Sequence, residues 1–113
     1  MKPYAPKPGD IVWTDFDPRL GREQGGRRPA LVLSPTAFFK ASHFAIVCPI
    51  SSRIRPFSTS VVLPDTLPIK GEVLTSHIRS IDTQARPIAH AGCKVPPAIL
   101  AEARGKVAAL IGL

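Results

Sequence analysis

Three guanidinium groups, one carboxylate and one amide are concentrated in a single glycine-rich stretch, Gly21 to Pro29. The stretch reads Gly-Arg-Glu-Gln-Gly-Gly-Arg-Arg-Pro. Arginine presents a planar, permanently charged fork that suits phosphate, and glycine lets another chain or a ligand approach the backbone closely. Such a loop buries little apolar surface, so its composition favours a binding function. A solvated hairpin loop, whose charges only keep the protein soluble, is the alternative interpretation.

Two more sets of polar side chains lie later in the chain. Residues 51–58 form a basic, hydroxyl-rich segment, and a histidine and an arginine follow in a stretch with strand character. Positive charge adds affinity for a phosphate backbone without reading its sequence, and an imidazole titrates near neutral pH and can contact a base edge. Taken singly, each is more often a solvated surface residue. The candidate RNA contacts are Gln24, Arg27, Ser52, Arg53, Arg55, His77 and Arg79.

Length and composition predict a single globular domain, residues 1–113, with one modest core. The net charge of +7 favours an acidic partner such as nucleic acid or an acidic protein. No segment is apolar enough to serve as a signal peptide or to span a membrane, which predicts a cytoplasmic protein. Cys48 and Cys93 are expected to be reduced, buried thiols there.

Metal and cofactor chemistry has no support in the sequence. His43, His77 and His90 are scattered, without the paired spacing of a zinc site. There is no nucleophile-elbow motif and no glycine-rich phosphate loop of the Walker or Rossmann type. RNA cleavage without a metal or a cofactor remains open, because the ribose 2′-hydroxyl is a nucleophile that the substrate itself supplies.

The elements that must position these groups are mostly strands. Residues 11–16, 30–33, 44–50, 60–63, 72–81 and 88–93 have strand character, with the second apolar on both faces and therefore central. Pro49 is expected to interrupt or end the third strand, and residues 36–42 are expected to be a connector. After Pro96 the apolar residues recur at helical spacing, up to Ile111. These patterns predict a small curled antiparallel sheet or β-barrel with a C-terminal helix.

Several ordered pieces together resemble MazF/PemK-type toxins, the sequence-specific endoribonucleases of bacterial toxin–antitoxin pairs. The resemblance covers nearly the whole chain, and its first third is the most specific part. It implies the mainly β MazF/CcdB-type toxin fold, an SH3-like barrel with a C-terminal helix. The pieces are Gly9–Trp13, Asp15–Pro18, Glu23–Gly26, Arg28–Pro35, Val47–Ser52, Val73–Leu74, Ile78–Asp82 and the apolar C-terminal helix.

The resemblance implies a catalytic role for Arg28, the arginine before the proline. Ser51 stands where the family has a second key residue, a threonine, and keeps the hydroxyl. Glu23 matches the family's loop glutamate and is expected to be a proton acceptor or a loop organiser, or else an ion-pair partner of a neighbouring arginine. The implied reaction on single-stranded RNA needs no metal and leaves a 2′,3′-cyclic phosphate and a 5′-hydroxyl. The implied partners are a second copy of the chain, as a homodimer, and an acidic antitoxin.

A further departure concerns specificity. Ser76 and His77 stand where many members of the family have an acidic residue and a glutamine. Two alternatives to the ribonuclease remain open. One is a CcdB-type gyrase poison, against which the absence of a C-terminal Trp-Gly-Ile and the presence of Arg28 argue. The other is an RNA-binding relative that has lost catalysis.

Overall fold

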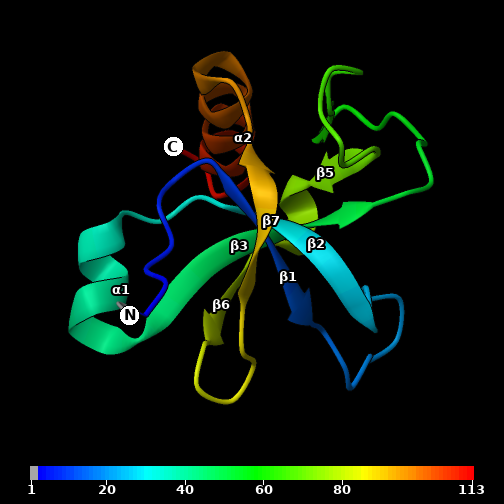
Figure 1. The fold of residues 1–113 in the computed structure, drawn as a ribbon. Coiled ribbons are helices and arrows are strands. Elements are labelled where there is room, and N and C mark those ends of the chain that lie inside the picture. The colour runs from blue at the N-terminus through cyan, green and yellow to red at the C-terminus, as the bar shows by residue number, and fades with distance from the viewer. Residues whose placement is uncertain (1–2) are drawn as a thin grey trace.

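The computed structural model describes residues 3–113, which form seven strands, two α-helices and one 3₁₀ turn (Figure 1). The strands are β1 (Asp10–Asp15), β2 (Arg27–Val32), β3 (Phe44–Ser51), β4 (Ser60–Val62), β5 (Glu72–Leu74), β6 (Arg79–Asp82) and β7 (Ala89–Lys94). The helices are α1 (Thr36–Ser42) and α2 (Pro97–Leu110), and the 3₁₀ turn is Thr75–His77.

All strand pairs are antiparallel, and the sheet runs in the order β4-β5-β3-β2-β1-β7. The long strand β3 organises it. One edge of β3 pairs with β2, and the other pairs first with β6 and then with β5. The sheet is open, with β4 and β7 at the ends of this path. The prediction of a mainly β protein with a curled antiparallel sheet and a C-terminal helix is confirmed.

Apolar side chains fill both faces of this sheet, because successive residues of a strand point to opposite sides. On β2, Leu31 joins one cluster and its neighbours Ala30 and Val32 join the other. The prediction that this strand is central is confirmed by its place between β1 and β3. The first cluster contains Ile11, Leu31, Leu33, Cys48, Ile50, Val61, Leu63, Val73, Val95 and Ala103. The second contains Val12, Phe16, Ala30, Val32, Ala45, Val47 and Ile81.

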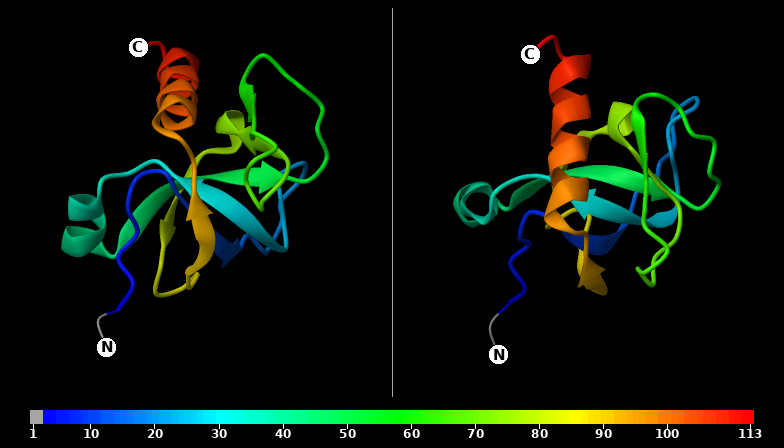
Figure 2. Two further views of the ribbon diagram at one scale, coloured as in Figure 1. Left: turned by 45° about the horizontal axis from the view of Figure 1, so that its top comes forward. Right: turned by 90° about the horizontal axis from the view of Figure 1, so that it is seen from above.

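Helix α2 stands against the first cluster, to one side of the sheet (Figure 2). A proline suits its first turn, where the missing N–H has no intrahelical partner. Ala103 is fully buried, whereas Leu110 and Ile111 at the far end of the predicted stripe are 45% and 67% exposed. Neither helix of residues 3–113 has the length and apolar composition that a membrane crossing requires.

Three local expectations are wrong. Residues 36–42 form a helix and not a connector. Residues 72–81 form two short strands, β5 and β6, separated by the 3₁₀ turn. This turn moves the chain from pairing with the end of β3 to pairing with its beginning. Pro49 neither interrupts nor ends β3, which continues to Ser51. Pairing with β6 stops at Val47 and pairing with β5 starts at Ile50, so the missing N–H of Pro49 falls where this edge changes partner.

Both cysteines are free thiols. Cys48 lies in the core, where burial raises the pKa of its thiol to about 12. Cys93 is only half-buried, contrary to expectation. Partial burial raises its pKa as well, and a hydrogen bond with the backbone of Ile69 opposes that rise.

Candidate functional site

Two loops carry most of the candidate residues, and they lie at the same end of the sheet. One joins β1 to β2 over residues 16–26, and the other joins β3 to β4 over residues 52–59. Figures 1 and 2 show both loops on the side of the molecule away from α1. The sheet therefore brings together two segments that are about thirty residues apart in the chain.

Hydrogen bonds within the glycine-rich loop hold Arg28 in place. The Arg28 Nε donates to the carbonyl of Gly25 at 2.7 Å, and the N–H of Gly26 donates to Asp17 Oδ1 at 2.7 Å. A side chain at Gly25 would come within 2.6 Å of the Cβ of Arg19. Glycine is therefore required at this position by packing, and the loop has a defined shape that fixes one arginine at its base.

Ser51, the last residue of β3, is fixed from the neighbouring strand. It is buried and lies opposite Glu72 in the antiparallel pairing of β3 with β5. Gly71, just before β5, has a φ of +134°, and a Cβ built there would lie 2.1 Å from the Ser51 carbonyl oxygen. Only glycine permits this close approach and this backbone conformation. The Ser51 hydroxyl accepts a hydrogen bond from the N–H of Arg53 at 3.2 Å.

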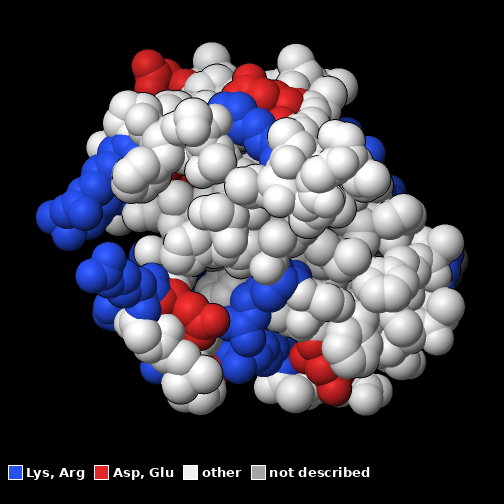
Figure 3. All heavy atoms as spheres, turned by 180° about the vertical axis from the view of Figure 1, so that it is seen from behind, with Lys and Arg blue, Asp and Glu red and all other residues white. Residues whose placement is uncertain are grey.

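A cleft of about 570 Å³ lies between the two loops. It brings together eight of the ten candidate residues: Glu23, Gln24, Arg28, Ser51, Ser52, Arg53, Arg55 and His77. Arg19, Arg22, Gly25, Phe57, Thr59, Glu72, Leu74 and Ser76 complete its lining. Figure 3 shows basic side chains gathered around a hollow on this side of the molecule, with acidic groups among them. Five arginines against two glutamates make the cleft suited to a polyanion.

The remaining two candidates lie outside this cleft. Arg79 lines an adjoining hollow of about 460 Å³ that shares Glu23, Gln24 and His77 with it, and its guanidinium lies 5.6 Å from the Phe16 ring centre. Arg27 lines a third hollow, which shares Arg28 and Ser52 with the cleft, and its guanidinium lies 5.9 Å from the centre of the Trp13 ring. Arg27 and Arg28 are successive residues of β2, so their side chains leave on opposite faces.

Of the lining residues that were not candidates from sequence, Phe57 and Glu72 have side chains suited to a role with a substrate. Phe57 is 60% exposed on its wall, where an aromatic ring offers a stacking surface for a base. A lone aromatic residue in a basic, hydroxyl-rich loop was the available signal. Glu72 lies in the cleft lining with only 1% of its surface exposed. No sequence signal marked it, because its burial depends on how β5 pairs.

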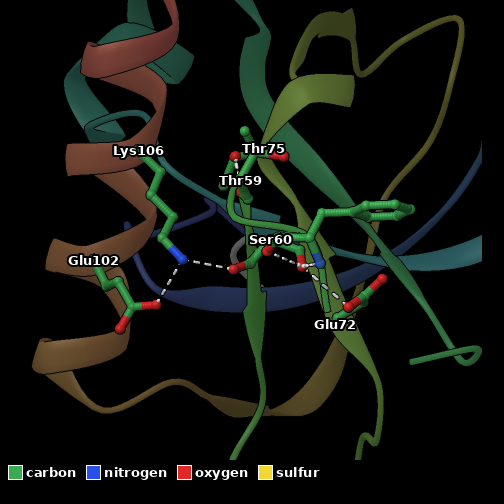
Figure 4. Close-up of polar contacts among 7 residues, drawn as sticks. Thr59, Ser60, Glu72, Thr75, Glu102 and Lys106 are labelled. Atoms are coloured by element: carbon green, nitrogen blue, oxygen red, sulfur yellow. Dashed lines mark hydrogen bonds and ion pairs between the residues drawn. The ribbon is translucent and has the colours of Figure 1, made fainter. Parts of the chain in front are cut away.

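Glu72 belongs to a polar network that reaches α2 (Figure 4). Its Oε2 accepts a hydrogen bond from the Ser60 hydroxyl at 3.1 Å. The carbonyl of Ser60 accepts one from Lys106 Nζ at 2.7 Å, and Lys106 also pairs with Glu102 at 3.3 Å. The carbonyl of Thr59 accepts a hydrogen bond from Thr75. The end of the basic loop is thus tied to both β5 and the C-terminal helix.

The chemistry that this cleft supports is electrostatic stabilisation together with proton transfer. Arginines stabilise negative charge on phosphoryl oxygens, a buried hydroxyl positions a phosphate, and carboxylates accept protons. Within residues 3–113, no group of three or more histidine, cysteine, aspartate or glutamate side chains is arranged to hold a metal ion. The groups present fit a phosphodiester substrate.

Comparison with known proteins gives the same family from sequence and from structure. Residues 7–111 match the family described as PemK-like, MazF-like toxin of type II toxin–antitoxin system. The endoribonuclease toxin MazF of Escherichia coli (strain K12) is 35% identical over 109 residues, covering 96% of each chain.

Solved structures agree with this. The crystal structure of MazF from Deinococcus radiodurans superposes with a TM-score of 0.93 at 42% identity, covering 98% of this chain and 100% of that one. A MazE–MazF crystal structure from the same organism matches with a TM-score of 0.87 at 42% identity, covering 98% and 99%. This chain therefore belongs to the PemK-like, MazF-like toxin family of type II toxin–antitoxin systems.

Proposed function

We propose that this protein is a sequence-specific endoribonuclease toxin that cleaves single-stranded RNA without a metal ion. The ribose 2′-hydroxyl attacks the adjacent phosphorus, which leaves a 2′,3′-cyclic phosphate and a 5′-hydroxyl. The observation that carries the proposal is the joint placement of Arg28 and Ser51 in a cleft lined by five arginines. Relatives that match nearly the whole chain are named endoribonucleases, which supports the same reaction.

The candidate residues from the sequence have the following roles in this reaction. Arg28 stabilises the negative charge that develops on the phosphoryl oxygens, and the Ser51 hydroxyl binds the scissile phosphate. Glu23 accepts a proton or organises its loop. The remaining arginines neutralise flanking phosphates, while amide, hydroxyl and imidazole groups contact the nucleotides. These contacts are assigned to Gln24, Ser52, Arg53, Arg55 and His77 in the cleft, and to Arg27 and Arg79 in the two adjoining hollows.

The test is cleavage of a long single-stranded RNA by the purified protein in EDTA, with mapping of the cut sites and their termini. We expect cuts at one short motif that leave cyclic phosphates. Arg28→Ala is expected to lower kcat by about 10²–10³-fold, because a preorganised charge is removed. Lys40→Ala is the matched control, since it removes one positive charge from α1, away from the cleft. Absence of cleavage by the folded protein across RNAs of varied sequence would contradict the proposal.

We further propose that the chain acts in the cytoplasm as a single domain, residues 1–113, in a homodimer. Leu110, Ile111 and Leu113 are 45%, 67% and 88% exposed at the end of α2, and this apolar surface supports self-association. The +7 charge supports neutralisation by an acidic antitoxin segment that folds on the toxin. The MazE–MazF structures of D. radiodurans are consistent with such a complex. A monomer at micromolar concentration in sedimentation would contradict the dimer.

A further inference from the structure

Glu72 is a buried carboxylate that the reaction described above does not yet use. It is the first residue of β5, it is 1% exposed, and it lines the cleft between the two loops. Removing a carboxylate from water is costly unless the group is paired. No cation lies within 4.0 Å of the Glu72 carboxylate in the part of the chain that the structure describes. A buried carboxylate that lines the cleft without a neighbouring cation is therefore a candidate for chemistry there.

Strand register places Glu72 in one row with the two principal site residues. Ser51 is the direct cross-strand partner of Glu72. In the pairing of β2 with β3, Ala30 lies opposite Pro49, and the same register continued by two residues sets Arg28 opposite Ser51. Directly opposite residues share a face of the sheet, with Cβ atoms about 5 Å apart. Arg28, Ser51 and Glu72 therefore form a row across three adjacent strands, and all three line the cleft.

The carboxylate of Glu72 is oriented but not saturated with hydrogen bonds. Oε2 accepts the hydrogen bond from Ser60, whose carbonyl is held by Lys106 of α2. Figure 4 shows the other carboxylate oxygen directed away from Ser60. A carboxylate has about four acceptor sites on its two oxygens. Glu72 is thus oriented by the Ser60 hydroxyl, which also lies 3.1 Å from the Phe57 carbonyl oxygen, and it retains acceptor capacity on a carboxylate that lines the cleft.

We propose that Glu72 is the group that accepts the proton of the attacking 2′-hydroxyl, an inference that rests on the ribonuclease function proposed above. As the 2′-oxygen forms its bond to phosphorus, its proton passes to the Glu72 carboxylate. The bond from phosphorus to the 5′-oxygen breaks, and that oxygen takes a proton from water. Glu72 then returns its proton to the solvent, so the reaction consumes no net proton.

Glu23, the other carboxylate of the cleft, differs in how it is held. It is an exposed residue of the glycine-rich loop, whereas Glu72 lies on a strand and is hydrogen-bonded to Ser60. A proton acceptor must lie within hydrogen-bond reach of the proton that it removes. A buried side chain in register with Ser51 satisfies this condition more firmly than a side chain on an exposed loop. Glu23 is then left with the role of loop organiser.

The experiment compares Glu72→Gln with the matched variant Glu23→Gln, using RNA cleavage in EDTA from pH 4 to 9. We expect Glu72→Gln to lower kcat by about 10²-fold or more and to lose the rise of rate with pH on the acid side. Binding of an RNA with a 2′-deoxy nucleotide at the cut site should change less than about threefold, because glutamine keeps the shape and the acceptor for Ser60. Glu23→Gln should retain that acid-side rise.

The failure of this inference is distinguishable from the failure of the proposed function. If Glu72→Gln cleaves like the parent while Arg28→Ala does not cleave, Glu72 has only a structural role and the ribonuclease stands. If Glu72→Gln loses its cooperative thermal transition, Glu72→Asp replaces it, since it keeps the charge but withdraws it by one methylene. A kcat reduced more than about tenfold with the acid-side rise retained supports the proposal, and parental kcat overturns it.

Discussion

Asp10 and Glu72 are both buried carboxylates, with 5% and 1% of their surfaces exposed, but their surroundings differ. Asp10 Oδ2 accepts hydrogen bonds from the Tyr4 hydroxyl at 2.6 Å and from the N–H of Lys7 at 3.0 Å. Its Oδ1 lies 3.7 Å from His90 Nε2. Glu72 has the single hydrogen bond from Ser60 and borders the cleft. Burial alone therefore does not distinguish the two carboxylates, whereas hydrogen bonding and position relative to the cleft do.

The partners of Asp10 show what that carboxylate does. The N–H of Gly92 donates to His90 Nδ1 at 2.9 Å, which leaves Nε2 as the ring nitrogen that faces Asp10. The Tyr4 ring also packs edge-on against the imidazole, with centroids 5.3 Å apart. Asp10 thus fastens the N-terminal segment to the start of β1, beside His90 of β7. Asp10 stabilises the fold, whereas the row formed by Arg28, Ser51 and Glu72 lines the cleft.

The largest expected change in stability comes from Gly71→Ala, which disturbs the backbone next to Glu72. The new Cβ would lie 2.1 Å from the Ser51 carbonyl oxygen, and the φ of +134° is strained for alanine. We expect a loss of about 3 kcal/mol or more in the free energy of unfolding, measured by urea denaturation. In the control Gly105→Ala the new Cβ meets nothing within 4 Å, and we expect a gain of about 1 kcal/mol. Equal stability of Gly71→Ala and the parent would contradict the close approach.

Asp10→Ala tests whether the Asp10 carboxylate has only a structural role. It leaves the Tyr4 hydroxyl without its acceptor, and we expect a loss of about 2 kcal/mol in the free energy of unfolding. The cleavage rate per folded molecule should stay within about twofold of the parent, because Asp10 lies outside the lining of the cleft. If the folded Asp10→Ala protein loses cleavage, the division between a structural and a functional carboxylate is wrong.

Tyr4→Phe gives the smallest effect and adds a pH dependence. Removing one hydrogen bond is expected to cost about 1 kcal/mol. Burial, then the hydrogen bond to Asp10 and its charge, raise the pKa of Tyr4 above its ordinary value of 10.0. The stabilisation is therefore complete below pH 10 and is lost as the pH rises further, since the unfolded chain ionises first. Stability measured from pH 8 to 11 should fall more steeply in the parent than in Tyr4→Phe, which keeps only the loss from the other groups with raised pKa values, such as the buried Cys48 thiol.

Short-range patterns in the sequence were enough for most of the fold. Strand character, proline punctuation and the helical spacing after Pro96 predicted the sheet and α2, because each depends on neighbouring residues. The break at Thr75–His77 was missed. The chain leaves β5 there to reach another part of β3, a requirement that arises from pairing between distant segments.

The candidate site also contains residues that the sequence reveals and residues that only strand pairing reveals. Arg28 and the basic loop were recognised because charge and glycine content are visible in the sequence, and the structure brings most of these residues into one cleft. Arg27 was grouped with Arg28 because sequence proximity does not show which face a side chain occupies. Glu72 was missed because a glutamate beside a glycine is usually exposed. Its burial follows from pairing with Ser51, twenty-one residues earlier.

The register of the β1–β2 hairpin determines where the chain can gain or lose residues without moving Arg28. Thr14 pairs with Arg28 and Asp15 with Arg27, and the glycine-rich loop begins only beyond these pairs. Residues added to the loop would leave Arg28 on its present face. One residue removed from β2 after Arg28 would shift the register and place Arg27 where Arg28 now lies, on the face of the cleft. Insertions in the loop are therefore expected to be tolerated, whereas a one-residue deletion in the strand would replace Arg28 by Arg27 at the cleft.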